Sequence, residues 1–238
     1  MKNLLLTAIT VFAITASAQN KFTGTLKKYC TTLPNEFSQI SEDRKSTLKE
    51  IGNYVLETRK NNKIAKLTII CTHNSRRSQM GQIWGQIAGF YYGVDSIIFF
   101  SGGTEATAFN ERAINALKKT GIQIQKTTEG DKNPKYTVTA GNNYSPILMY
   151  SKKYSDRQNP QSDFGAIMVC SEADKSCPVV QGAESRFSLP YDDPKYYDGT
   201  PSETSKYDER CRQIARETFF MMDYVKGKLI LIKESTKK

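Results

Sequence analysis

Histidine and closely spaced cysteine pairs are scarce in this chain of 238 residues. The chain has one histidine, His73, and five cysteines, of which only Cys170 and Cys177 lie near each other in sequence. Zinc sites need about four histidine, cysteine or carboxylate ligands, often supplied as two short-spaced pairs. The sequence therefore predicts no metal site, and no motif predicts a bound cofactor.

Long apolar runs are missing after the N-terminal segment. Residues 4 to 14 are mostly apolar, Lys2 precedes them, and residues 16 to 18 read Ala-Ser-Ala, which fits signal-peptidase cleavage. The apolar run is short for a membrane span, so a signal peptide over residues 1–18, cleaved after Ala18, is favoured over an uncleaved anchor helix. We therefore expect an exported protein, periplasmic or secreted, with no stable membrane span after cleavage.

Acidic residues are outnumbered, which leaves a formal net charge of +10. The basic residues are spread along the chain, and no helix-turn-helix, zinc-finger or aromatic RNA-binding signature accompanies them. We expect no nucleic-acid partner. The charge indicates either an ordinary solvated basic surface or a surface that attracts small anionic substrates.

Hydrophobic periodicity indicates strands and helices that alternate along much of the chain. This order is typical of a parallel α/β sheet. Strands are predicted at 66–71, 96–100, 164–169 and 185–189, and helices at 78–92, 109–120 and 203–225.

The remaining segments define the predicted domain organisation. Residues 19–63 form an arm with little periodicity followed by a helix over 37–59, in which Ser41 can cap an inner helix start. The main domain covers 64–228, and about 125–162 within it is an inserted hairpin or flap. Residues 229–238 form a basic tail.

Cys71 opens the segment that carries most of the chemistry, CTHNSRRS. A thiol and Arg77 with five residues between them, at a strand-to-helix turn, suit a tetrahedral oxyanion, because backbone N–H groups and the positive helix end can surround it. The fork of Arg77 can clamp two oxygens, and the same positive field favours the reactive thiolate. The alternative is a buried cysteine that ends a core strand. The predicted oxyanion-binding residues are Thr72, His73, Asn74, Ser75, Arg76 and Arg77.

This loop resembles the phosphate-binding loop of low-molecular-weight protein tyrosine phosphatases and thioredoxin-coupled arsenate reductases. The resemblance extends over about 64–226 apart from the insertion. It implies a three-layer α/β sandwich around a central four-stranded parallel sheet. Further similar stretches are 101–106 (SGGTEA), 110–124 (NERAINALKKTGIQI), 167–178 (IMVCSEADKSCP) and 191–194 (YDDP).

The resemblance implies a role for each matching residue. Cys71 is the nucleophile, Ser78 hydrogen-bonds its thiolate, and Arg77 stabilises the charge that develops on the oxyanion. Asp193 is the general acid, although residues 192–194 taken alone suit a simple turn. With a phosphomonoester, a phosphocysteine forms and water hydrolyses it.

Cys170 and Cys177 resemble the second and third cysteines of the reductases. The resemblance implies that Cys170 attacks the Cys71 arsenate adduct and that Cys177 takes over the disulfide for a thioredoxin-like reductant. The alternative is a structural Cys170–Cys177 disulfide, which export to an oxidising compartment would favour.

Four features, of which three are departures from the family pattern, bear on the choice of substrate. His73 replaces a loop glycine, Arg76 replaces a cysteine common in the phosphatases, and Gln82 stands where reductases carry a cation-site glutamate. Tyr196 and Tyr197 are similar to an aromatic pair of the phosphatases. The cysteine set favours an arsenate reductase-like enzyme. The alternatives are a phosphatase-like phosphomonoester hydrolase and, third, a non-catalytic oxyanion-binding protein.

Overall fold

The computed structural model describes Phe22 and residues 24–141, 143–177 and 179–235. The predicted signal peptide lies outside the described residues. Among the described residues, no helix has both the length and the apolar character needed to cross a bilayer.

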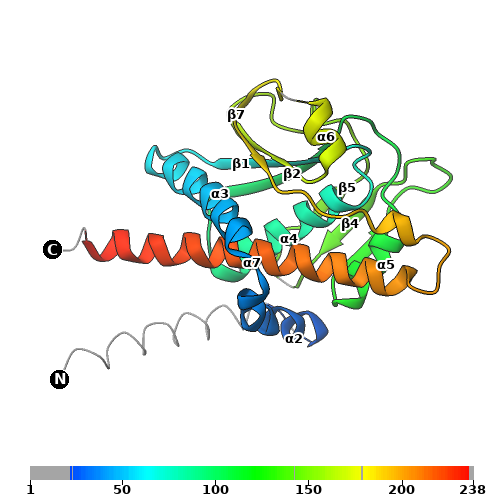
Figure 1. Cartoon of the computed structure of the whole chain (residues 1–238), viewed down its shortest axis with the longest axis horizontal. Helices are drawn as coiled ribbons and strands as arrows, with labels where there is room; N and C mark the ends of the chain where they lie inside the picture. The colour runs from blue at the N-terminus through cyan, green and yellow to red at the C-terminus, as the bar shows by residue number, and fades with distance from the viewer. Residues whose placement is uncertain (1–21, 23, 142, 178, 236–238) are drawn as a thin grey trace.

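A four-stranded parallel sheet forms the centre of the domain (Figure 1). Its strand order is β2 (Ile97–Gly103), β1 (Ala65–Cys71), β6 (Phe164–Met168) and β7 (Ala183–Ser188), and neighbouring strands are parallel throughout. The predicted α/β class and four-stranded parallel sheet are therefore confirmed. Because β1 lies between β2 and β6, Cys71 at its carboxyl end is flanked by the carboxyl ends of two neighbouring strands.

Strand β2 continues through Gly102 and Gly103, where the sequence predicted that it would stop. Both glycines lie against neighbouring backbone: a Cβ at Gly102 would collide with Tyr154, and a Cβ at Gly103 would collide with Glu105 and Thr72. The glycines therefore serve close packing inside the strand rather than termination.

Three helices pack together against one face of this sheet. They are α3 (Glu42–Lys60), α4 (Arg77–Tyr92) and α7 (Glu203–Ser235). Residues from all three helices lie around Ile69, Phe99 and Ile167 of the strands. Two shorter helices complete this part of the fold: α5 (Glu111–Lys119) packs on α7, and α6 (Ser171–Ser176) lies against β1 and β6.

The N-terminal region is more helical than predicted. Helix α2 (Gly24–Thr32) and a 3-10 helix, η1 (Leu33–Gln39), occupy the predicted arm. Leu26 and Cys30, one turn apart, are buried in the core, and this tertiary packing stabilises a helix that sequence periodicity did not reveal. The helix predicted over 37–59 is interrupted before α3, where Ser41 accepts a hydrogen bond from the Arg44 amide and caps the helix as predicted.

The inserted segment belongs to a second, antiparallel sheet. The predicted hairpin corresponds to β4 (Tyr136–Thr139) and β5 (Ile147–Met149), and β3 (Gln123–Lys126) pairs with β4 to add a third strand. The flap is therefore a small sheet with its own buried side chains, including Val138 and Met149.

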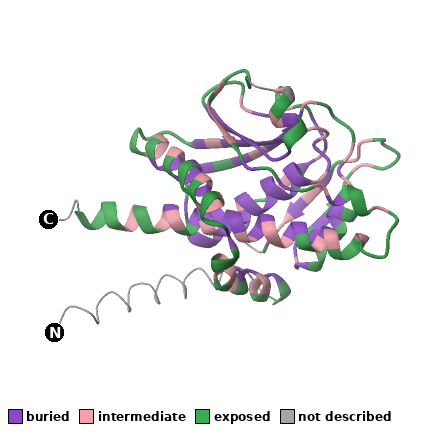
Figure 2. Cartoon of the chain, in the orientation of Figure 1, coloured by how far each residue is buried: buried purple, intermediate pink, exposed green. Residues whose placement is uncertain are grey.

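Helix α7 is longer than predicted and includes most of the predicted basic tail. Its buried residues end at Val225, and the part beyond projects from the body of the domain as a mostly exposed helix (Figure 2). The good helix formers Lys226, Lys228 and Leu229 extend a helix that the core already supports.

Candidate active site

The loop between β1 and α4 begins at the buried Cys71 and ends at Arg77. Its carbonyl groups are held by the segment that follows β2: the Cys71 carbonyl accepts from the Thr104 amide at 3.2 Å, and the Thr72 carbonyl accepts from the Glu105 amide at 2.8 Å. These bonds tie the start of the loop to the segment that follows β2.

The loop amides are available to an anion. Within the part of the chain that the structure describes, the backbone N–H groups of residues 73 to 76 have no protein acceptor. Asn74 has a φ of 45°, and this left-handed residue curls the loop. A run of N–H groups in such a turn, followed by a helix N-terminus, forms a concave site for an oxyanion.

Asn74 holds the loop together through its buried side chain. The side-chain amide donates to the Ser78 hydroxyl at 2.9 Å, and the Asn74 Oδ1 atom accepts from the Lys152 amide at 2.9 Å and from Gln79 at 3.2 Å. Ser75 is also turned inward, donating to the Ala108 carbonyl at 2.6 Å. Of the predicted oxyanion-binding residues, these two therefore offer backbone N–H groups rather than side chains.

Cys71 and Ser78, the predicted nucleophile and its hydrogen-bond partner, lie in contact. The Cys71 sulfur lies 3.0 Å from the Ser78 hydroxyl oxygen, and both residues are buried. Because Asn74 already donates to that oxygen, the hydroxyl proton of Ser78 is free to point at the sulfur. This arrangement favours a sulfur that carries negative charge.

Arg77 approaches the site from the first residue of α4 and is almost fully buried. Its Nη2 atom donates to the Asp193 carboxylate at 2.8 Å, and its Nη1 atom donates to the Tyr191 carbonyl at 2.9 Å. Among the described residues, its buried Nε atom has no acceptor. The guanidinium is therefore held in place by two of its five N–H groups, and its Nε–H group has no acceptor among the described residues.

Asp193 is the predicted acid residue that reaches the site. It lies at the start of the 3-10 helix η2 (Pro194–Tyr197) and pairs with Arg76 as well as Arg77, whereas the neighbouring Asp192 is exposed and pairs with Arg210. Burial alone would raise the pKa of Asp193. The charges of Arg77 and Arg76, with hydrogen bonds from Arg76 and the Lys195 amide, outweigh that effect and lower it.

Arg76, Arg77 and Asp193 line a pocket of about 310 Å³, and the buried Cys71 and Ser78 lie behind its lining. Basic side chains predominate in its lining, which suits an anionic ligand. The lining residues are Thr72, His73, Arg76, Arg77, Glu172, Asp193, Lys195 and Tyr196.

Cys170 lies beside the nucleophile loop. It is buried, and its sulfur is 3.4 Å from the Thr72 hydroxyl oxygen. Cys177 lies at the other end of α6 and is partly exposed, and both cysteines are free thiols. A helix rises 1.5 Å per residue, so α6 places the two Cα atoms roughly 10 Å apart, beyond the reach of a disulfide. The structure thus lacks the alternative structural disulfide, and α6 must unwind before these thiols can join.

The chain is similar to two kinds of known protein. The chain is 35% identical over 128 residues to arsenate reductase 2 of Staphylococcus epidermidis, a match that spans 52% of this chain and 75% of that protein. It is 29% identical over 134 residues to an arsenate reductase of Halalkalibacterium halodurans, spanning 56% of this chain and 77% of that protein. This chain belongs to the arsenate reductase family. It is therefore an enzyme that attacks an oxyanion with a cysteine thiolate.

A solved low-molecular-weight phosphotyrosine phosphatase from Vibrio cholerae is also similar, with a TM-score of 0.45 and 15% identity, covering 67% of this chain and 95% of that one. No family model matches the chain.

His73, which replaces a loop glycine of the family, is held in the loop through its carbonyl group. Its carbonyl accepts from the Ser151 hydroxyl at 2.9 Å and from the Thr107 hydroxyl at 3.3 Å, and its ring lies 3.6 Å from the Glu105 carboxylate at the pocket mouth. Gln82 of α4, which also departs from the family pattern, accepts a hydrogen bond from the Ser101 hydroxyl at 2.6 Å. Across the described residues, no group of three possible ligands could hold a metal ion.

Sequence reasoning missed the contribution of the inserted segment. Ser151 and Lys152 follow β5 and hold the backbone of the nucleophile loop through His73 and Asn74. Arg186 was also missed: it donates to the Cys177 carbonyl at 3.2 Å and pairs with Asp174 at 2.5 Å, tethering α6 to β7. Neither role has a local sequence signal, because each depends on contacts between distant segments.

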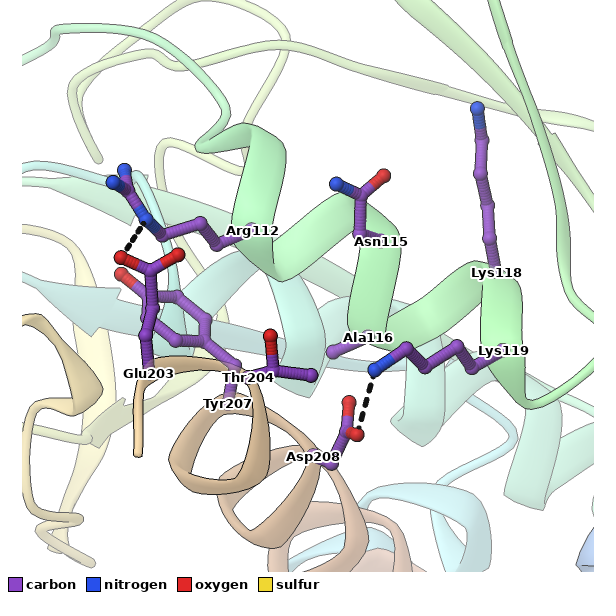
Figure 3. Close-up of a pocket in the computed structure, with 9 residues that line it drawn as sticks. All are labelled: Arg112, Asn115, Ala116, Lys118, Lys119, Glu203, Thr204, Tyr207 and Asp208. Carbon is purple, nitrogen blue, oxygen red and sulfur yellow. Dashed lines mark hydrogen bonds and ion pairs between the residues drawn. The ribbon is translucent and has the colours of Figure 1, made fainter. Parts of the chain in front are cut away.

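A larger hollow of about 610 Å³ lies between α5 and the start of α7, and it shares no residue with the pocket that Arg77 and Asp193 line (Figure 3). Two ion pairs cross it, Arg112 with Glu203 and Lys119 with Asp208, each at 2.8 Å. The four paired side chains are partly exposed, and the buried Tyr207 that also lines the hollow donates its hydroxyl to Asp198 at 2.9 Å.

Proposed function

We propose that this chain is an arsenate reductase-like enzyme in which Cys71 attacks arsenate and Cys170 and Cys177 relay the resulting disulfide. The observation that carries the proposal is the position of Cys170. Its sulfur is 3.4 Å from the side chain of Thr72, the residue that follows the nucleophile. A phosphatase has no use for a second thiol at that point, whereas a reductase needs one.

The first step forms an S–As bond. The Cys71 thiolate attacks the arsenic of bound arsenate, an As–O bond breaks, and the departing oxygen leaves as water after taking up protons. The amides of residues 73 to 76 and the free Nε of Arg77 hold the remaining oxygens. Ser78 stabilises the thiolate before attack.

The second step is a two-electron transfer. The Cys170 thiolate attacks the Cys71 sulfur, the S–As bond breaks, and its electron pair stays on arsenic, which leaves as arsenite. A Cys71–Cys170 disulfide remains. Cys177 then attacks Cys170 and frees Cys71, which requires α6 to unwind.

The Cys170–Cys177 disulfide must then be reduced by an external dithiol. We propose a thioredoxin-like protein as this partner, because Cys177 is the more exposed of the two sulfurs. We also propose that residues 1–18 direct export. The reductant would then have to work outside the cytosol, where thiols tend to be oxidised.

Hydrolysis of phosphomonoesters is the second candidate function. Two observations favour it: Asp193 reaches the pocket, and Tyr196 lines the same pocket with 75% of its surface exposed, available to an aromatic substrate. This reaction uses the same Cys71 attack and ends with hydrolysis of a phosphocysteine.

A side-by-side assay tests the proposed function. The mature chain is incubated with arsenate plus a dithiol donor, and separately with p-nitrophenyl phosphate, and arsenite and p-nitrophenol are measured. We expect dithiol-dependent arsenite release. Ester hydrolysis without arsenite release would favour the phosphatase instead, and release of neither product would exclude both candidates.

A further inference from the structure

Arg76 and Asp193 form a two-pronged ion pair at the pocket wall. The Arg76 Nε atom donates to one carboxylate oxygen at 2.9 Å, and its Nη2 atom donates to the other at 3.3 Å. Both side chains are largely buried, with 11% and 13% of their surfaces exposed. A planar fork on a carboxylate in a partly desolvated position is a strong charge-assisted interaction.

Positive groups surround the Asp193 carboxylate on more than one side. Arg77 from α4 donates to it at 2.8 Å, and the Lys195 amide from η2 donates at 3.0 Å. The Lys195 and His73 side chains and the Glu172 carboxylate line the same pocket, and the Tyr207 phenol of α7 is close enough to interact electrostatically with Asp193. The net effect lowers the pKa of Asp193, as described above.

We propose that Arg76 is a specificity-determining residue, which keeps Asp193 ionised and thereby disfavours phosphoester cleavage relative to reaction with an inorganic oxyanion. This inference rests on the proposed function. It concerns the choice between the substrates of the Cys71 site and adds no step to the thiol relay.

The reason is the source of the proton for the leaving group. When Cys71 attacks a phosphomonoester, the S–P bond forms and the P–O bond to the organic group breaks, leaving its electron pair on an oxygen that carries no proton. An ionised Asp193 has no proton to give to that oxygen. Arsenate is itself partly protonated near neutral pH, so its departing oxygen already carries a proton.

The test compares two esters that differ in leaving group. Phenyl phosphate releases a phenol with a pKa of about 10, similar to tyrosine, and p-nitrophenyl phosphate releases a much more acidic phenol that needs little protonation. In Arg76→Gln we expect kcat for phenyl phosphate to rise about tenfold relative to kcat for p-nitrophenyl phosphate. This gain is a fraction of the rate enhancement that a general acid typically supplies. KM should rise for both esters because a positive charge is lost from the pocket.

Two matched variants control this experiment. Arg112→Gln removes an arginine from an ion pair outside the pocket and should leave the ratio of the two kcat values unchanged. Adding Asp193→Asn to Arg76→Gln should abolish the gain, because the gain depends on that carboxyl. A kcat ratio in Arg76→Gln equal to that of the unmodified enzyme would overturn the proposal.

A direct titration separates this proposal from the proposed function. The carboxyl carbon of Asp193 is followed by NMR against pH in the full chain and in Arg76→Gln, with Asp193→Asn used for assignment. The apparent pKa of Asp193 should be higher in the variant, even if no substrate is turned over. An unchanged value would overturn the inference about Arg76 and leave arsenate reduction by the thiols untouched.

Discussion

The sulfur of Cys71 lies 3.0 Å from the hydroxyl oxygen of Ser78, at the start of helix α4. The hydroxyl oxygen also accepts from Asn74, which leaves its own proton available to a thiolate at Cys71. A hydrogen bond to the charged form of a group stabilises that form. This single contact links the strand that carries the nucleophile to the helix that carries Arg77.

Ser78→Ala should therefore slow turnover without removing the nucleophile. We expect kcat to fall by about tenfold to a hundredfold, because one charge-assisted hydrogen bond of about 1.5–3 kcal/mol is lost from the thiolate. Steady-state kinetics with arsenate and with p-nitrophenyl phosphate measure the effect, and Ser78→Thr, which keeps the hydroxyl, is the control. Equal loss in both variants would assign the effect to packing.

Cys71→Ser should abolish turnover of arsenate and of aryl phosphate alike. A serine hydroxyl ionises far less readily than a thiol, so attack on the central atom fails while the anion cup remains. Arsenite release and p-nitrophenol release are the measurements, and phosphate binding by calorimetry checks that the cup is intact. Full activity in this variant would mean that Cys71 is not the nucleophile.

Cys170→Ser should separate the two candidate reactions. Arsenate reduction should be lost because the Cys71 adduct has no second thiol to resolve it, whereas hydrolysis of an aryl phosphate should stay within about twofold of the unmodified enzyme. Cys177→Ser should allow one round of arsenite release and then stop, which a rapid-quench experiment detects. Equal loss of both activities in Cys170→Ser would indicate a structural role for this buried residue.

Asn74 allows the backbone and side-chain contributions of one loop residue to be separated. Asn74→Gly keeps the positive φ at no steric cost but loses the hydrogen bonds to Ser78 and Lys152, whereas Asn74→Ala loses both the hydrogen bonds and the preferred conformation. We expect the alanine variant to be less stable than the glycine variant by about 1 kcal/mol. Urea unfolding measures the difference, and equal stabilities would show that the φ of Asn74 is unimportant.

Lys152 should make stability depend on pH in the alkaline range. Burial lowers the pKa of Lys152 to about 8, opposed in part by the charge of Asp156. Between about pH 8 and pH 10 the unfolded chain then binds the lysine proton more tightly than the folded chain, so the contribution of Lys152 to the free energy of unfolding rises with pH.

The free energy of unfolding is measured against pH for the unmodified protein and for Lys152→Met. The difference between the two values isolates the contribution of Lys152 from that of the other titrating groups. It should change by on the order of 2 kcal/mol over that range in favour of the unmodified protein. Lys153→Met, at the exposed neighbouring position, is the control and should show no such change. A difference for Lys152→Met that is constant with pH would contradict the prediction.

Much of the fold follows from local patterns in the sequence. The buried run that becomes β1 and the helical spacing that becomes α4 are visible without coordinates, because burial on both faces of a strand and on one stripe of a helix imposes those patterns. The short helix α2 was missed, since its stability comes from packing Leu26 and Cys30 into a core formed by distant segments.

The sequence by itself indicated the chemistry at Cys71, because a thiol and Arg77 at fixed spacing across a strand-to-helix turn favour a compact oxyanion-binding loop. The tertiary structure alone decided what surrounds that loop. It brought Ser151 and Lys152, which follow the inserted sheet, against the loop, and it joined Arg76 to the carboxylate of Asp193, 117 positions away. Local spacing fixes the geometry of a turn, whereas pairing across such separations depends on how the whole chain packs.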